Sequence, residues 1–197
     1  MTESTRHIER IFEETGALLS GHFLLSSGKH SDRYLEKFNL LRRPADTEVI
    51  CRGFVDHFRL AAVELVAGPT TGGILLAFEV ARQMKLPAVY AERATEGSIR
   101  REFRRGSHIE PGTRVLLVDD IMTTGGSINE TIAALEDVGA VIVGIGILAD
   151  RSNGAITFGA YPLHALLQLD VRAWERDDCP LCAQGVPITK PGTTNVR

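Results

Sequence analysis

The stretch RVLLVDDIMTTGGSINETIAAL, from Arg114 to Leu135, decides the fold and indicates the site. Its apolar run, Arg114–Val118, predicts a buried strand, and an amphipathic helix follows the loop of small residues. Asp119 and Asp120 stand at the end of the strand. The loop supplies backbone N–H groups and hydroxyls at a helix N-terminus, where the partial positive charge favours a phosphate. The stretch therefore predicts a strand–loop–helix unit that binds an anion.

The two acidic residues indicate a ligand that is more than a phosphate. A phosphate alone would repel Asp119 and Asp120, whereas carboxylates accept hydrogen bonds from vicinal sugar hydroxyls and suit Mg²⁺. We therefore expect a sugar phosphate, with its phosphate in the loop Thr123–Ser127 and its diol on the aspartates. The alternative is a plain strand-to-helix turn in which one aspartate only caps backbone groups.

Strands and helices alternate along the rest of the chain. The apolar runs Val63–Ala67, Ala88–Ala91 and Val141–Leu148 predict further strands, and helices are expected over 4–15, Pro44–Phe58 and Ile74–Met84. This alternation predicts an α/β fold with a parallel sheet and helices on both faces. We expect a single domain over 1–197, with a small hood lobe over about 16–43 and a core over about 44–158. The Pro-, Gly- and Thr-rich segment 171–197 is expected to be partly loose.

The composition excludes several classes of protein. The chain has 197 residues, a net charge of -3 and a pI near 6.1, which give no electrostatic footprint for nucleic acid or an anionic membrane. No apolar stretch approaches the roughly 20 residues of a membrane span, and no secretory signal is visible. Three cysteines are too few for a disulfide framework. We therefore expect a cytoplasmic protein with small-molecule partners.

The motif VLLVDDIMTTGGS resembles the ribose-phosphate signature of the type I phosphoribosyltransferases. The stretches GHFLLSSGKHSDRYLEKFNLL and ADRSNGA resemble, more narrowly, the orotate phosphoribosyltransferase family. The resemblance covers about residues 16–156. It implies transfer of the 5-phosphoribosyl group from 5-phosphoribosyl 1-diphosphate (PRPP) to orotate in pyrimidine biosynthesis, with Mg²⁺, by a homodimer. A purine or another base as acceptor, and a PRPP-binding regulator without turnover, remain alternatives.

The resemblance also implies roles for individual residues. Asp119 and Asp120 would be the catalytic carboxylates, and Arg151 would hold the carboxylate of orotate. The Mg²⁺ would be carried by PRPP, with no direct side-chain ligand. The implied PRPP contacts are Asp119, Asp120, Ile121, Met122, Thr123, Thr124, Gly125, Gly126, Ser127, Thr71, Gly72 and Arg93. The implied orotate contacts are Thr123, Arg151, Tyr34 and Leu35.

Two segments depart from the family's pattern. Gly72 stands where the family usually has a lysine after Gly-Pro. The family's mobile loop usually contains Arg-Lys and a later Lys-x-His, whereas this chain has AERATEGSIRREFRRG. Its arginines can replace the missing cations, because arginine binds phosphate bidentately, or they can form a solvated hairpin tip with the neighbouring glutamates. The candidates are Arg93, Arg100, Arg101, Arg104 and Arg105.

The sequence Cys179-Pro180-Leu181-Cys182 is not explained by the resemblance. It can be half of a zinc site completed across a dimer, or a redox pair, but two ordinary thiols are the simplest interpretation. No histidine has a cysteine partner by spacing, so we do not expect histidine to bind metal. Lys29 and His30, in the hood, are either phosphate contacts or turn residues.

Overall fold

The computed structural model describes residues 3–25 and 27–191. Its core is a six-stranded sheet in the order β5-β4-β3-β6-β7-β8. Five strands are parallel, and β5 pairs antiparallel with β4. The strands are β3 (Leu65–Pro69), β4 (Ala88–Arg93), β5 (Arg101–Phe103), β6 (Arg114–Met122), β7 (Val141–Asp150) and β8 (Leu163–Gln168).

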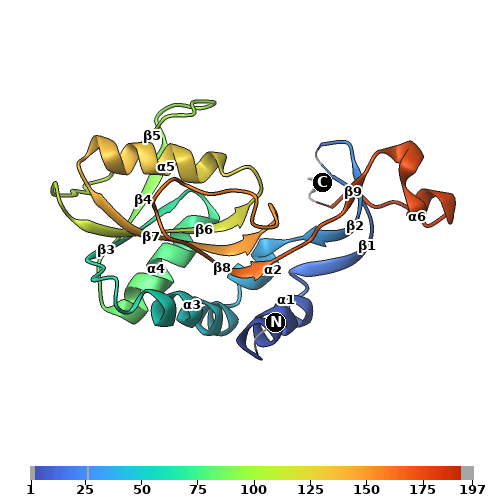
Figure 1. Ribbon diagram of the computed structural model, residues 1–197, viewed down its shortest axis with the longest axis horizontal. Helices are drawn as coiled ribbons and strands as arrows, with labels where there is room; N and C mark the ends of the chain where they lie inside the picture. Colours follow the sequence, from blue (N-terminus) through green and yellow to red (C-terminus); the bar gives the residue numbers. More distant parts are fainter. Residues whose placement is uncertain (1–2, 26, 192–197) are drawn as a thin grey trace.

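Helices cover both faces of this sheet, as the alternating pattern predicts (Figure 1). One apolar cluster joins α1 (Glu3–Glu14), α3 (Pro44–Phe58) and α4 (Gly72–Met84) to one face. A second cluster joins α5 (Gly126–Asp137) to the other face. Because both faces are covered, the central strands are apolar along nearly their whole length. No helix among the described residues is long and apolar enough to cross a membrane.

Two glycines of β7 let α3 lie close to the sheet. A Cβ at Gly144 would stand 2.3 Å from the Phe58 ring, and one at Gly146 would stand 2.8 Å from the Phe54 ring. Both phenylalanines are buried. The glycines of the sequence GIGILA therefore serve helix–sheet packing.

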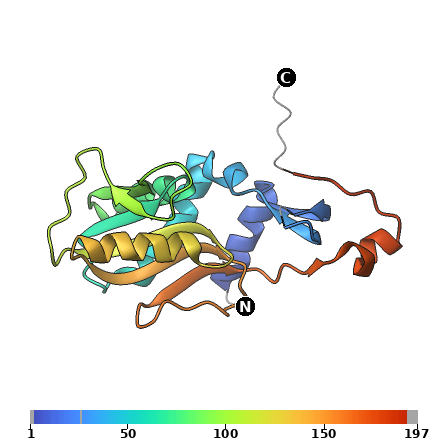
Figure 2. The same ribbon diagram turned by 90° about the horizontal axis from the view of Figure 1, so that it is seen from above.

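The hood is a three-stranded antiparallel sheet in the order β1-β2-β9. It consists of β1 (Leu18–Leu24), β2 (His30–Leu35) and β9 (Ala173–Trp174), and α2 (Lys37–Leu41) leads from it towards the core. The chain returns to the hood after β8, so that β9, a 3-10 turn (Arg176–Asp178) and α6 (Pro180–Ala183) lie at its outer end (Figures 1 and 2). The segment expected to be loose thus contributes a strand to the hood as far as the structure describes it.

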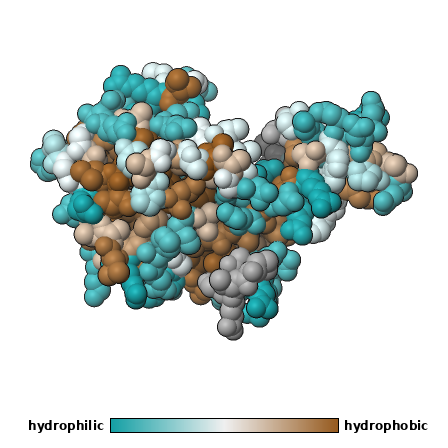
Figure 3. Space-filling view, viewed as in Figure 1, coloured by the Kyte–Doolittle hydropathy of each residue, from teal (hydrophilic) through white to brown (hydrophobic). Residues whose placement is uncertain are grey.

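The hood buries few apolar side chains away from its junction with the core. In the view of Figure 3, hydrophobic residues gather over the six-stranded sheet, whereas the outer end of the hood is mainly hydrophilic or intermediate. Only two residue pairs join β9 to β2, and one isolated bridge joins Phe23 to Thr189. The outer hood therefore depends on contacts other than an apolar core.

Several element boundaries differ from the sequence-based expectation. β6 runs to Met122 rather than ending at Val118, so both aspartates belong to the strand. β3 lies two residues later than expected, and α4 begins two residues earlier and ends at Met84 as expected, which is the usual uncertainty at element ends. The polar segment 92–110 contains β5, which forms a hairpin with β4. No alternating pattern in this segment is strong enough to predict so short a strand.

Candidate active site

The two aspartates are buried at the carboxyl end of β6. Only 4% of Asp119 and 5% of Asp120 is exposed. The Ser127 hydroxyl donates to Asp119 Oδ2 over 2.6 Å, and the Asp120 backbone N–H donates to Asp119 Oδ1 over 2.8 Å. Asp120 Oδ2 lies 2.7 Å from Lys37 Nζ. Because successive side chains of a strand point to opposite faces, one carboxylate is held by α5 and the other by α2.

The charge of this pair is only partly compensated. Burial, and secondarily the charge of Asp120, raise the pKa of Asp119 to about 6. The Ser127 hydroxyl and the Lys37 ammonium act in the opposite direction. Burying two adjacent carboxylates lowers the stability of the folded state. Acidic residues whose pKa values are perturbed by burial are concentrated at functional sites. Lys37 is a site residue that the sequence analysis did not single out, because its approach to Asp120 depends on where the hood meets the core.

The loop between β6 and α5 has the form expected of a phosphate site. Thr123 and Thr124 are exposed, and Gly125 adopts a left-handed conformation with φ of 75°. α5 begins at Gly126 with no side-chain cap on its first turn and no acidic residue there. Its first N–H groups are therefore available to an anion.

The loop Gly68–Gly73, at the end of the neighbouring strand β3, packs against the Asp119–Asp120 pair. A Cβ at Gly72 would stand 1.8 Å from Asp120 Oδ2, and one at Gly68 would stand 2.2 Å from the Gly73 carbonyl oxygen. No larger residue fits at position 72 without displacing Asp120. This close approach explains the glycine in place of the lysine that the resemblance implies. The neighbouring Thr71 is exposed.

Arg151 follows β7 at the same edge of the sheet. Its backbone N–H donates to the Met122 carbonyl over 2.8 Å, which joins it to the end of β6. Asp150 accepts from the backbone N–H groups of Ser152 and Gly154, so the turn after Arg151 is fixed. Burial lowers the pKa of the half-buried Arg151 guanidinium, and its Nε is buried without a hydrogen-bond partner. An unpaired donor on a cation is suited to binding a carboxylate.

Three of the predicted contact residues pack their side chains into or against the core. Tyr34 and Leu35 are neighbours on β2, so they point to opposite faces: the Tyr34 ring packs 5.8 Å from the Phe23 ring, while Leu35 is buried in the larger apolar cluster. Met122 is likewise buried, in the cluster under α5, and the partly buried Ile121 packs against the other cluster. The side chains of Leu35 and Met122 therefore belong to the core, whereas that of Ile121 stays partly exposed.

The five candidate arginines differ in how they are held. Arg101 is buried; it donates to Glu130 over 2.9 Å and to Thr70 Oγ1 over 3.3 Å. The other four are exposed and pair with glutamates of the hairpin or of α5; they are Arg93, Arg100, Arg104 and Arg105. Arg101 thus joins the hairpin to the loop of β3. The four exposed arginines can exchange their glutamate partners for other anions with little change in free energy, because exposed ion pairs are weak.

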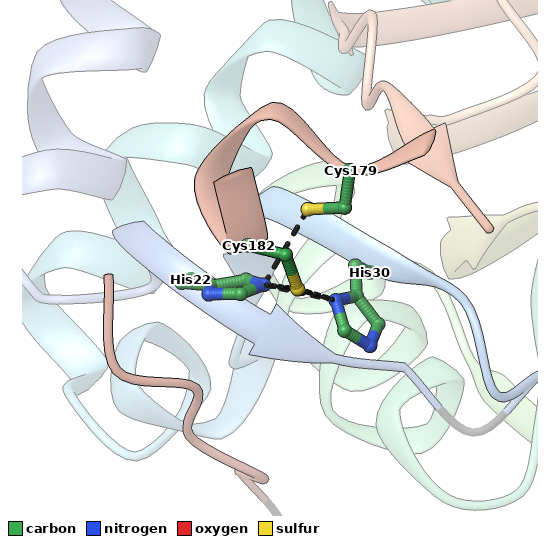
Figure 4. A group of neighbouring side chains, drawn as sticks. All are labelled: His22, His30, Cys179 and Cys182. Carbon is green, nitrogen blue, oxygen red and sulfur yellow. Dashed lines mark hydrogen bonds between the residues drawn. The ribbon is translucent and has the colours of Figure 1, made fainter. Parts of the chain in front are cut away.

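Histidines and cysteines meet in the hood, contrary to the sequence-based expectation. His22 and His30 lie beside Cys179 and Cys182, with all four candidate ligand atoms within 4.8 Å of one another (Figure 4). Sequence spacing could not show this, because more than 150 residues separate His22 from the cysteines.

Comparison with known proteins agrees with this geometry. The family model of the phosphoribosyl transferase domain matches residues 60–158. The orotate phosphoribosyltransferase of Caldicellulosiruptor saccharolyticus is 44% identical over 95% of this chain and 96% of its own length. That of Thermotoga maritima is 42% identical over 96% of this chain and 100% of its own.

Solved structures share the fold. The orotate phosphoribosyltransferase of Aeropyrum pernix superposes with a TM-score of 0.70 at 27% identity, covering 82% of this chain and 93% of that one. The adenine phosphoribosyltransferase of Thermoanaerobacter pseudethanolicus has a TM-score of 0.60 at 16% identity, with 70% of this chain and 88% of that one covered, which shows the fold alone. By sequence similarity along nearly its whole length, this chain belongs to the orotate phosphoribosyltransferase family of the type I phosphoribosyltransferases.

Proposed function

We propose that this protein transfers the 5-phosphoribosyl group from PRPP to orotate, forming orotidine 5′-phosphate and pyrophosphate for pyrimidine biosynthesis. The observation that carries the choice of orotate is the buried, unpaired Nε of Arg151 at the edge of the sheet that also bears the acid pair. A base with a carboxylate satisfies this donor, whereas a purine does not.

PRPP would bind across the carboxyl ends of β6 and β3. Its 5′-phosphate would lie in the loop Thr123–Ser127, against the uncapped N-terminus of α5. Its ribose hydroxyls would donate to Asp119 and Asp120, and its diphosphate would lie along the loop 68–73. Hydrogen bonding to the diol would replace contacts that Ser127 and Lys37 make in the free protein.

Mg²⁺ would arrive with the diphosphate rather than be held by the chain. The carboxylate oxygens suit Mg²⁺, but in the complex both aspartates would accept hydrogen bonds from the ribose diol, so the residues fit a metal carried by PRPP. When bound, Mg²⁺ neutralises charge on the leaving diphosphate.

The reaction exchanges one bond at C1 of the ribose. The bond between C1 and the diphosphate oxygen breaks, and its electron pair leaves with the diphosphate. The ring nitrogen of orotate forms a bond to C1 and loses its proton. Positive charge develops on the ribose in between, as in glycoside cleavage, and the Asp119–Asp120 pair stabilises it. Arg151 orients orotate, so positioning replaces a covalent nucleophile.

Lys37 would supply the cation that Gly72 does not. Its ammonium already lies 2.7 Å from Asp120 Oδ2, where a side chain at position 72 has no room. The exposed arginines of the β4–β5 hairpin, including Arg93, would close over the diphosphate, in a homodimer over the site of the partner subunit. Closure would exclude water.

The assignment of Arg151 is tested by comparing Arg151→Ala with Arg59→Ala, a substitution of an exposed arginine just after α3. We expect Arg151→Ala to raise the KM for orotate by about 10²-fold or more and to leave PRPP affinity unchanged, because a charged hydrogen bond is lost. Arg59→Ala is expected to behave like the unmodified protein. Equal orotate KM values in the two variants would contradict the assignment.

A further inference from the structure

We propose that His22, His30, Cys179 and Cys182 form a tetrahedral Zn²⁺ site that ties the C-terminal segment to the hood hairpin. The four side chains come from three parts of the fold: His22 from β1, His30 from β2, and the cysteines from the start and body of α6 (Figure 4). None of them is among the residues to which the proposed phosphoribosyl transfer gives a role.

The distances between the candidate ligand atoms suit one central ion. His22 Nε2 lies 2.9 Å from His30 Nδ1 and 3.5 Å from Cys179 Sγ, and Cys182 Sγ lies 3.3 Å from His30 Nδ1 and 3.8 Å from His22 Nε2. Tetrahedral Zn²⁺ with ordinary bond lengths requires about 3.4 Å between two nitrogens and about 3.6 Å between a nitrogen and a sulfur. These four separations are within about half an ångström of those values, and all four ligand atoms lie within 4.8 Å of one another.

Hydrogen bonding alone does not explain the arrangement. The other ring nitrogen of His22, Nδ1, lies 2.7 Å from the Val186 carbonyl oxygen, which can only accept. Nδ1 therefore carries the hydrogen, and Nε2 of the neutral ring offers a single lone pair. Three groups approach that one lone pair, from His30, Cys179 and Cys182. A cation at the centre satisfies all four ligand atoms at once, and the carbonyl contact is the usual partner of a metal-bound histidine.

The local backbone directs these side chains together. The pairing of β1 with β2 shifts register between Ser20 and Phe23, and such a bulge re-aims side chains on the bulged strand. On the other side, Cys179 precedes the first turn of α6, Pro180 begins it, and Gly185 follows it with φ of 69°. The Ala183 N–H donates to the Cys179 carbonyl oxygen, which closes the C-x-x-C turn, and the Gly185 N–H donates to the Cys182 carbonyl oxygen.

The chemistry of the four ligands favours Zn²⁺. Two thiolates and two imidazoles in tetrahedral arrangement are typical of structural zinc sites, which use four protein ligands and leave no open position. On binding, the two thiols release two protons, so the thiolates neutralise the ion. His22, His30 and Cys179 are buried and Cys182 is partly exposed, which leaves an entry path from the hollow lined by Arg176 and Asp177.

The site would supply stability that the outer hood otherwise lacks. β9 is two residues long, and the returning chain meets β1 through one isolated bridge and a few hydrogen bonds that involve Val186 and Thr189. Small lobes of this kind commonly depend on a metal in place of an apolar core. Because β1 and β2 also carry the Phe23–Tyr34 contact, the ion would hold the wall of the hood that faces the base.

The test is the metal content of the full chain, purified without an affinity tag and without chelator, then incubated with Zn²⁺ and desalted. We expect about one Zn per chain by inductively coupled plasma mass spectrometry. We expect less than about a tenth of that in Cys182→Ser and His22→Asn. The controls Cys51→Ala and His108→Gln, which change residues far from the cluster, are expected to keep the ion.

Two measurements on the unmodified chain remain decisive if a variant fails to fold. Titration with a mercurial that captures thiols should release the Zn in proportion to two thiols, and Co²⁺ in place of Zn²⁺ should give the visible absorption of a tetrahedral site with sulfur ligands. No metal after incubation with Zn²⁺, a Cys179–Cys182 disulfide in the freshly purified protein, or Zn retained by Cys182→Ser would each overturn the proposal.

Discussion

Replacing Asp119 with asparagine is expected to make the protein more stable at neutral pH while impairing its activity. The carboxyl of Asp119 is buried beside Asp120, and its pKa is raised from 3.8 to about 6. Asparagine keeps the shape of the side chain and an oxygen that accepts from the Ser127 hydroxyl, and it loses only the hydrogen bond that Asp119 Oδ1 accepts from the Asp120 N–H. It carries no charge, so the cost of burying a carboxylate disappears.

The pH dependence of the gain in stability follows from linkage. The pKa of the Asp119 carboxyl is 3.8 in the unfolded state and about 6 in the folded state. Between these two values the folded state binds more protons than the unfolded state, so the free energy of unfolding falls as the pH rises. At about one pH unit below 3.8 and lower, the carboxyl is protonated in both states, and its cost vanishes. Between pH 4.5 and pH 8 the stability gap between Asp119→Asn and the unmodified protein should widen by about 1–2 kcal/mol.

Urea unfolding at several pH values measures this gap, with Asp56→Asn, an exposed aspartate of α3, as control. The control curve should run parallel to that of the unmodified protein. Turnover of Asp119→Asn should fall by about 10²-fold or more, because charge developing on the ribose loses a partner. A gap that stays constant with pH, or that narrows as the pH rises, would refute the account of Asp119 as a carboxylate buried at a cost.

Three further substitutions test the site and the core. Gly72→Ala places a Cβ 1.8 Å from Asp120 Oδ2; it should cost about 1–3 kcal/mol in urea unfolding and raise the KM for PRPP. Lys37→Met removes a cation that lowers the pKa of Asp119, so the acidic limb of the pH–rate profile should move to higher pH, and an unmoved limb would contradict this. Burial and the stacked His57 lower the pKa of His164 to about 4. As the pH drops from about 6.5 to 4, His164 therefore binds a proton in the unfolded state but not in the folded state, and the free energy of unfolding falls. Because His164 is half exposed, His164→Gln should remove only about 1 kcal/mol of that loss, and an unchanged slope would refute the assignment.

Local sequence patterns predicted the core and the centre of the site. The strand–loop–helix unit around Asp119 was readable because a buried strand, a small-residue loop and an amphipathic helix are contiguous in the chain. The parallel sheet followed from the alternation of such units. The edge of the sheet where these loops meet then follows from the topology, which is why Arg151 could be placed near the acid pair.

Features that depend on contacts between distant segments could not be read in this way. Lys37 approaches Asp120 only because α2 connects the hood to the core, and β9 joins the hood from the far end of the chain. The C-x-x-C pair was interpreted most simply as two ordinary thiols, because its histidine neighbours lie on β1 and β2, far away in the sequence. The alternation along β2 could have separated Tyr34 from Leu35, but only once that segment was recognised as a strand.

Pyrophosphate release from PRPP and Mg²⁺ by the purified protein decides which base is the acceptor, when it is followed with orotate and, separately, with uracil, adenine, guanine and xanthine. Uracil is the sharpest comparison, because it is orotate without the carboxylate that Arg151 is proposed to hold. We expect rapid release with orotate, release slower by about 10²-fold or more with uracil, and none above background with the purines. Equal rates with uracil and orotate, preference for a purine, or PRPP binding without release for any base would contradict the proposed function.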